Sequence, residues 1–140
     1  MKKITSIDLF AGVGGMRISL SKALRKLGYI DECKLYSEIN SYSQQTYNEN
    51  FPETKLIEDI KSVDKKDINE MIPDHDILLA GFPCQPFSRA GISKRKNLKR
   101  AYGFEDKDQG DLFFNILDIL NTKKPRAFVL ENVQNLKNHQ

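Results

Sequence analysis

Cysteine is scarce in this sequence, long apolar runs are absent, and no stretch is repeated or of low complexity. The two cysteines, Cys33 and Cys84, lack metal-type spacing, which argues against a disulfide-rich secreted scaffold and against a zinc site. Nothing approaches the ~20 apolar residues of a membrane span, and the N-terminus lacks the apolar core of a signal peptide. We therefore expect a soluble cytoplasmic protein with no bound metal.

The composition is that of one globular domain. Hydrophobic residues make up 39% of the 140 residues, which suffices for one core and leaves no room for a second domain. The 22 Lys and Arg against 19 Asp and Glu give a net charge of +3, which permits a polyanionic partner without requiring one.

Hydrophobic periodicity alternates between the two kinds of regular structure. Short apolar or β-branched runs predict strands, and apolar residues at helical spacing predict helices, with Gly28 as a C-cap and Asp64 as the cap of a short helix. Strands are expected at residues 4–9, 34–37, 55–57, 76–80 and 127–130, and helices at 16–27, 41–50, 64–72 and 112–120. This alternation predicts an α/β fold, a Rossmann-like sheet of about five parallel strands with flanking helices.

Glycines cluster where the first expected strand meets the first helix. The run Asp8-Leu9-Phe10-Ala11-Gly12-Val13-Gly14-Gly15 lets backbone approach a nucleotide-like ligand at a helix N-terminus, although a bare tight turn would give the same pattern. Glu38 ends the second strand, where open α/β sheets place a ribose-binding carboxylate; a surface carboxylate at a helix start is the alternative. Asp59 and Ile60 follow the third strand and could contact an adenine, or simply form a loop.

A cysteine between two prolines follows the fourth strand, in the run Gly81-Phe82-Pro83-Cys84-Gln85-Pro86-Phe87-Ser88. The proline-stiffened turn holds the thiol in position, and nearby N–H groups or basic side chains could lower its pKa, which makes Cys84 a candidate nucleophile. The alternative is a buried packing role. We assign that role to Cys33, which lies in or beside a strand.

Together, the glycine run, Glu38, the Pro83-Cys84-Gln85 block and Glu131-Asn132-Val133 resemble, in this order, the front-half motifs of bacterial DNA cytosine-5 methyltransferases. The resemblance spans almost the whole chain. It implies S-adenosyl-L-methionine as the cofactor and an incomplete form of the methyltransferase sheet. The residues that it would place around the cofactor are Phe10, Gly12, Gly14, Gly15, Glu38, Asp59, Ile60 and Leu112.

The same resemblance implies the chemistry. Cys84 would attack carbon 6 of a cytosine flipped out of duplex DNA, which makes carbon 5 nucleophilic. Glu131 would bind or protonate ring nitrogen 3, a task that burial would favour; a solvent-facing strand end is the alternative. Supporting roles would fall to Pro83, Gln85, Asn132 and Val133. The basic stretch 89–100 would contact DNA or be only a solvated loop, with Ser88, Lys94, Arg95 and Lys96 as candidate contacts.

Motifs expected later in such enzymes do not follow Gln140. The arginine motif, the target-recognition region and the C-terminal motifs are absent, so residues 1–140 are interpreted as the N-terminal part of a catalytic domain. The strand at 127–130 would then expose an apolar edge, to be covered by a second polypeptide, a missing C-terminal part or self-association.

The chain would be a fragment, one subunit of a split restriction–modification enzyme, or a non-catalytic relic that binds cofactor or partner. An RNA cytosine-5 methyltransferase is the alternative enzyme.

Overall fold

A computed structural model describes residues 1–83 and 111–132, in which strands and helices alternate. The strands are β1 (Lys2–Leu9), β2 (Tyr29–Ser37), β3 (Lys55–Ile57), β4 (Ile77–Gly81) and β5 (Ala127–Glu131). The helices are α1 (Gly15–Lys26), α2 (Ser41–Asn50), α3 (Ile68–Met71) and α5 (Asp111–Lys123), with 3-10 turns η1 (Ile60–Ser62) and η2 (Lys65–Asp67). Across these two ranges, no helix combines the length and the apolarity needed to cross a membrane.

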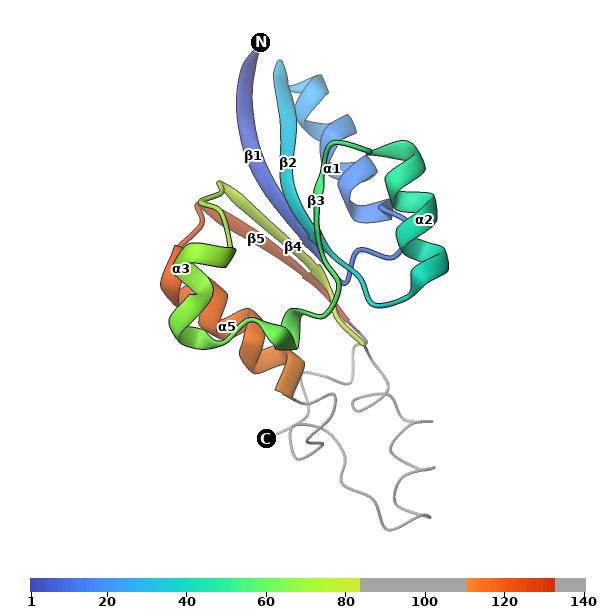
Figure 1. The fold of residues 1–140 in the computed structure, drawn as a ribbon. Coiled ribbons are helices and arrows are strands. Elements are labelled where there is room, and N and C mark those ends of the chain that lie inside the picture. The colour runs from blue at the N-terminus through green and yellow to red at the C-terminus, as the bar shows by residue number, and fades with distance from the viewer. Residues whose placement is uncertain (84–110, 133–140) are drawn as a thin grey trace.

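Every pairing in the five-stranded sheet is parallel, in the order β3-β2-β1-β4-β5. Helices α1 and α2 cover one face, and α3 and α5 cover the other (Figure 1). The chain runs outward from β1 to β3 and then crosses to place β4 on the other side of β1. Open α/β sheets bind ligands outside the carboxyl ends of the strands at such a reversal. The predicted Rossmann-like α/β class is confirmed.

The main hydrophobic core lies between the sheet and the layer formed by α3 and α5. It is built from alternate strand residues and one stripe of α5, including Ile7, Leu9, Leu35, Leu78, Ala80, Leu112, Ile116 and Ile119. Burying each of the larger aliphatic side chains contributes about 1.5–3 kcal/mol to the free energy of folding. This core therefore stabilises the packing of α5 on the sheet and, with it, the positions of the strand ends.

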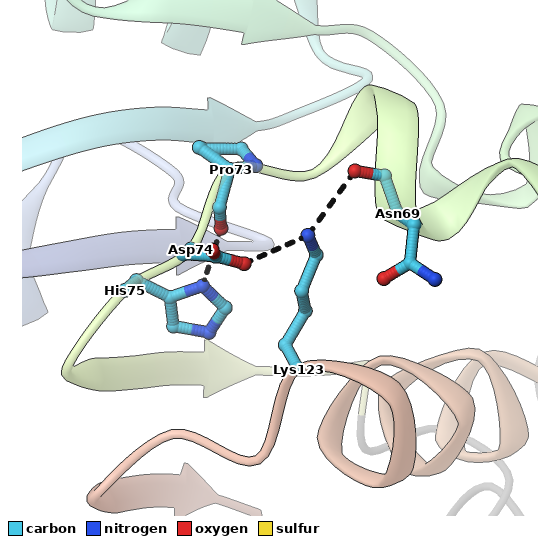
Figure 2. Close-up of polar contacts among 5 residues, drawn as sticks. All are labelled: Asn69, Pro73, Asp74, His75 and Lys123. Carbon is cyan, nitrogen blue, oxygen red and sulfur yellow. Dashed lines mark hydrogen bonds and ion pairs between the residues drawn. The ribbon is translucent and has the colours of Figure 1, made fainter.

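A lysine with a buried side chain lies near the amino-terminal ends of β4 and β5, where it links α5 to the segment between α3 and β4 (Figure 2). Lys123, in the last turn of α5, has a side chain only 5% exposed, and its Nζ donates to Asn69 O at 3.2 Å and to Asp74 Oδ1 at 3.0 Å. Beside it, the buried His75 places Nδ1 2.8 Å from Pro73 O. These contacts fix α5 against the connection from α3 to β4, so they help to align the neighbouring strands β4 and β5.

The largest differences from the predicted element boundaries are at β2 and α3. Strand β2 begins at Tyr29 rather than at residue 34. The first part of β2 is polar and lacks the apolar pattern of a strand, but it forms hydrogen bonds with β1, which extends back to Lys2. Asp64 makes no side-chain capping bond, and the helix begins only at Ile68 because the tight turn η2 comes between them. The predicted helix at 41–50 is confirmed as α2.

Candidate functional site

The turn after β1 bends toward the end of β2. Phe10, Gly12 and Gly14 have φ values of 56°, 54° and 92°, in the left-handed region that glycine adopts freely and that costs phenylalanine about 1–2 kcal/mol. The turn is held by the N–H of Ala11, which donates to Ser37 O at 3.0 Å, and by the N–H of Gly14, which donates to Ala11 O at 2.9 Å. Backbone strain of this kind gathers at functional sites.

Glu38 follows β2 and is anchored by two backbone N–H groups. Its Oε2 accepts from the N–H of Gly12 at 2.8 Å, and its Oε1 accepts from the N–H of Asn40 at 2.7 Å. Gln44 Nε2 donates to the carbonyl oxygen of Glu38 at 2.6 Å and fixes its backbone as well. Because each carboxylate oxygen has a second acceptor site and the side chain is half-buried, Glu38 can bind two further donors.

A pocket of about 350 Å³ opens at this edge of the sheet, within the size range of small-molecule sites. Its walls come from the ends of β1 to β4 and the start of α5: Phe10, Ser37, Glu38, Ile39, Asp59, Ile60, Lys61, Gly81, Pro83 and Leu112. The lining residues that were not predicted as site residues adjoin the motif residues at the same strand ends; they are Ser37, Ile39, Lys61 and Gly81. The structure therefore brings most of the predicted cofactor residues together around one cavity.

Asp59 and Ile60 form the start of η1 rather than an irregular loop. Asp59 Oδ1 accepts from the N–H of Lys61 at 2.9 Å, which is an N-terminal capping bond. Ile60 is 2% exposed, so its side chain belongs to the core and also forms part of the pocket wall. A carboxylate thus stands beside a rigid apolar surface.

Gly14 and Gly15 do not line this pocket. A Cβ on Gly14 would lie 2.9 Å from Phe51 Cε2 and 3.2 Å from Tyr47 Cε2, so glycine is needed there to let the rings of α2 and its C-terminal end pack on the turn. Gly15 borders a separate groove beside α1 and β4. Gly12 reaches the site through its N–H group, which binds Glu38. Direct cofactor contacts of these glycines stay predictions.

The ends of β4 and β5 lie side by side, with Gly81 paired to Glu131. A Cβ on Gly81 would lie 3.8 Å from Glu131 Oε2, so the carboxylate lies next to backbone that borders the pocket. Glu131 is exposed, so the burial that would favour its expected role is not found. Asn132 Nδ2 donates to Phe82 O at 2.9 Å and ties the two strand ends together.

Cys84, the candidate nucleophile, lies outside the described residues. The same holds for Gln85, Val133, Ser88, Lys94, Arg95 and Lys96. Pro83, which immediately precedes Cys84 in the chain, lines the pocket. The other cysteine, Cys33, is buried in β2 with Sγ 3.4 Å from Leu35 O, and burial raises the pKa of its thiol, which confirms a packing cysteine.

A buried polar cluster behind the glycine turn was missed by sequence reasoning. Asp8, on β1, is wholly buried, and burial raises its pKa to about 7, against the effect of a hydrogen bond from Tyr47 and of the charge of Arg17. The signal in the sequence was a carboxylate inside an apolar strand run, followed by an arginine at the start of the first helix. Tyr47, on α2, meets Asp8 and Arg17 only in the folded structure.

Comparison with known proteins gives consistent matches. The family described as C-5 cytosine-specific DNA methylase matches residues 4–140. A DNA-cytosine methyltransferase of Escherichia coli (strain K12) is 43% identical over 149 residues, covering 95% of this chain and 30% of that protein. The Type II methyltransferase M.NlaX of Neisseria lactamica is 48% identical over 133 residues, covering 95% of this chain and 37% of that protein.

Among solved structures, the methyltransferase EhMeth of Entamoeba histolytica has the same fold. Its TM-score is 0.70 at 23% sequence identity, over 99% of this chain and 40% of that chain. The present chain spans about a third of the length of the curated relatives that it matches.

Proposed function

This chain belongs to the C-5 cytosine-specific DNA methylase family, and on that premise we propose that it binds S-adenosyl-L-methionine and supplies the nucleophile for methylation of cytosine carbon 5 in duplex DNA. The pocket carries the proposal, because it gathers Phe10, Glu38, Leu112 and Pro83 at the edge of the sheet where such folds bind ligands. The Type II methyltransferases among the relatives favour a role in restriction–modification.

The hydrogen-bond acceptors and the apolar walls of the pocket would fit an adenosine group. Glu38 has acceptor sites left over from its bonds to the N–H groups of Gly12 and Asn40, and two adjacent ribose hydroxyls would donate to them. The Asp59 carboxylate would accept from the adenine amino group, and Ile60 would pack on the ring. Bound in this pocket, S-adenosyl-L-methionine supplies a methyl group activated by its sulfonium.

Cys84 is the proposed nucleophile. Its thiolate forms a bond to carbon 6 of the flipped cytosine, and the electron pair of the carbon 5–carbon 6 double bond becomes available at carbon 5. After carbon 5 is methylated, loss of its proton and expulsion of the thiolate restore the ring. The bond to Pro83, a pocket residue, keeps Cys84 near the cofactor site.

Glu131 would hold ring nitrogen 3, supply a proton there as the adduct forms and take it back as the thiolate leaves. It ends the strand that pairs with β4, next to Gly81 at the pocket border. Asn132 supports it, because its bond to Phe82 O fixes the distance between the two strand ends. Gln85 and Val133, which flank the two reacting residues in the sequence, would act as further supports.

DNA binding is proposed for the basic stretch that follows Cys84. Ser88, Lys94, Arg95 and Lys96 would contact phosphates, which would make binding weaker as the salt concentration rises. The relatives are about three times as long as the matched part, and the edge strand β5 exposes Phe128 and Val129. We therefore expect a further polypeptide segment or subunit to complete the sheet and to read the target sequence.

Covalent trapping tests this function. Duplex DNA that contains 5-fluorocytosine, together with S-adenosyl-L-methionine, is added to the chain alone and to the chain with the polypeptide encoded immediately downstream. Fluorine at carbon 5 cannot leave as a proton does, so the adduct accumulates and survives denaturation. We expect an adduct that Cys84→Ala abolishes and that the matched control Cys33→Ala retains.

Two other outcomes of the trapping experiment would contradict this function. Cofactor binding with no adduct in either mixture would overturn catalysis and leave a binding module. An adduct on structured RNA but none on duplex DNA would reassign the substrate.

A further inference from the structure

Tyr47 occupies the point where α1, α2, β1 and β2 meet. It is fully buried, and its ring stacks on that of Tyr36 with centroids 3.9 Å apart and planes 9° apart. Its hydroxyl accepts from Arg17 Nη1 at 3.3 Å and donates to Asp8 Oδ2 at 3.4 Å. A buried network of polar groups is unfavourable unless its geometry is kept, so it favours one arrangement of the elements that carry it.

Arg17 of this network and Gly14 of the glycine turn both contact residues at the C-terminal end of α2. The Arg17 guanidinium lies 3.9 Å from the centroid of the Phe51 ring and donates to Thr54 Oγ1 at 2.7 Å. The rings of Tyr47 and Phe51 also contact Gly14, where they leave no room for a Cβ. The turn is therefore supported from behind by the same side chains that hold Arg17.

On its other side, the turn meets the carboxylate that we propose binds the cofactor. The N–H of Gly12 donates to Glu38 Oε2, while Asn40, whose N–H donates to Glu38 Oε1, caps α2 by accepting from the N–H of Ser43. Glu38 is thus attached to the turn through Gly12 and to α2 through Asn40. Any shift of α2 relative to the turn changes the orientation of both carboxylate oxygens.

We propose that Tyr47, held between Asp8 and Arg17, is a positioning residue that sets the glycine turn and Glu38 for cofactor binding. This inference rests on the proposed function, because it assumes that the pocket binds S-adenosyl-L-methionine. Tyr47 lies outside the pocket lining, so it acts through the turn and not by touching the ligand.

The protonation of Asp8 gives a readout that a purely structural tyrosine would lack. The groups that face Asp8 are Tyr47 from α2, Arg17 from α1, Cys33 and Asp31 from β2, and Glu38 beyond β2. An ionised Asp8 accepts a stronger, charge-assisted bond from the Tyr47 hydroxyl than a neutral one does. Cofactor affinity should therefore rise as the pH increases through about 7, the pKa of Asp8, and by linkage the bound cofactor should lower that pKa.

Calorimetric titration of S-adenosyl-L-methionine into the chain at its full natural length tests the proposal. We expect Tyr47→Phe to weaken binding about 10-fold, in keeping with the loss of one or two buried hydrogen bonds. Tyr36→Phe is the matched control, since it removes the hydroxyl of the stacked ring. Among the described residues this hydroxyl donates to Asn48 Oδ1 at 2.8 Å and makes no hydrogen bond to the turn. That variant should bind as the wild type does.

The pH profile provides the second measurement, and it does not depend on the folding of Tyr47→Phe. The affinity of the wild type is compared with that of Asp8→Asn, which retains only the titration of the cofactor itself. Parallel profiles, or equal affinities for Tyr47→Phe and Tyr36→Phe, would overturn the positioning role while leaving the proposed function intact. Failure of the wild type to bind the cofactor at any pH would instead overturn the proposed function.

Discussion

At the scale of single residues, burial of Asp8 couples its protonation to folding. Its pKa rises from 3.8 in the unfolded chain to about 7 in the folded one, so the folded state binds more protons between these values. Stability from this group is present below about pH 4, is lost as the pH rises, and is gone above about pH 7. The buried His75 acts in the opposite sense, because burial lowers its pKa and acid then favours unfolding.

Replacing Asp8 by Asn should remove this dependence. We expect Asp8→Asn to become more stable relative to the wild type as the pH is raised from about 4 to about 8, by at most about 4 kcal/mol. Urea unfolding at a series of pH values measures the difference, in which the contribution of His75 cancels. A difference that stays constant with pH would contradict the assigned burial of an ionisable Asp8.

Glu38 should matter both for folding and for cofactor binding, because its carboxylate accepts from two backbone N–H groups and is proposed to accept from the ribose hydroxyls. In Glu38→Gln, an amide N–H₂ would have to face one of the N–H groups of Gly12 and Asn40, both of which now donate to the carboxylate. The amide would also offer the ribose hydroxyls a neutral acceptor in place of a charged one. Losing one charge-assisted bond to the cofactor costs about 1.5–3 kcal/mol, so affinity for S-adenosyl-L-methionine should fall roughly 10- to 100-fold. Calorimetry tests this, with Glu49→Gln on the exposed side of α2 as a control that should change nothing.

At the scale of elements, the three glycines at the turn from β1 into α1 differ in how strictly the structure requires them. Gly14 has a φ of 92°, and a Cβ at this position would lie only 2.9 Å from Phe51 Cε2. Gly12 is constrained only by its φ of 54°, and Gly15 has neither a positive φ nor a close neighbour. The packing of α2 against α1 therefore depends on Gly14. In contrast, nothing in the described structure prevents a side chain at Gly15.

Alanine at these three positions should separate the effects. Gly14→Ala should lose the most stability, because the rings of α2 must move, and Gly12→Ala should lose about 1–2 kcal/mol from backbone strain alone. Gly15→Ala should be neutral or slightly stabilising, because alanine favours a helix. Thermal unfolding of the three variants gives the order, and a Gly14→Ala protein as stable as Gly15→Ala would be inconsistent with the observed packing.

At the scale of the whole molecule, the sheet ends in an exposed apolar strand. β5 pairs only with β4 in the described sheet, and Phe128 and Val129 are 56% and 49% exposed. An edge of this kind offers unpaired backbone groups and apolar side chains to another chain. It is the place where a completing segment or a second copy would add.

The isolated chain should therefore self-associate through β5. We expect Val129→Lys to shift the sedimentation profile toward monomer, because a charge on the edge opposes strand pairing. Ile18→Lys, on the exposed side of α1, should leave the profile unchanged. A wild-type chain that stays monomeric at high concentration would rule out self-pairing.

The sequence by itself determined the α/β class, the position of the glycine turn and the location of Glu38 and Asp59 at strand ends, because these follow from local periodicity and from the few residue types that tight turns allow. It did not determine the full length of β2, since polar residues there are stabilised by pairing with β1 rather than by burial. It also gave no indication that Asp8, Arg17 and Tyr47 share one network.

Those contacts were decided only by the tertiary structure, because they join residues 30 and 39 positions apart that meet only when α1 and α2 pack on the same face of the sheet. The distinction between Gly14 and Gly15 has the same origin: the two are chemically identical neighbours, and only the rings that pack on Gly14 separate them.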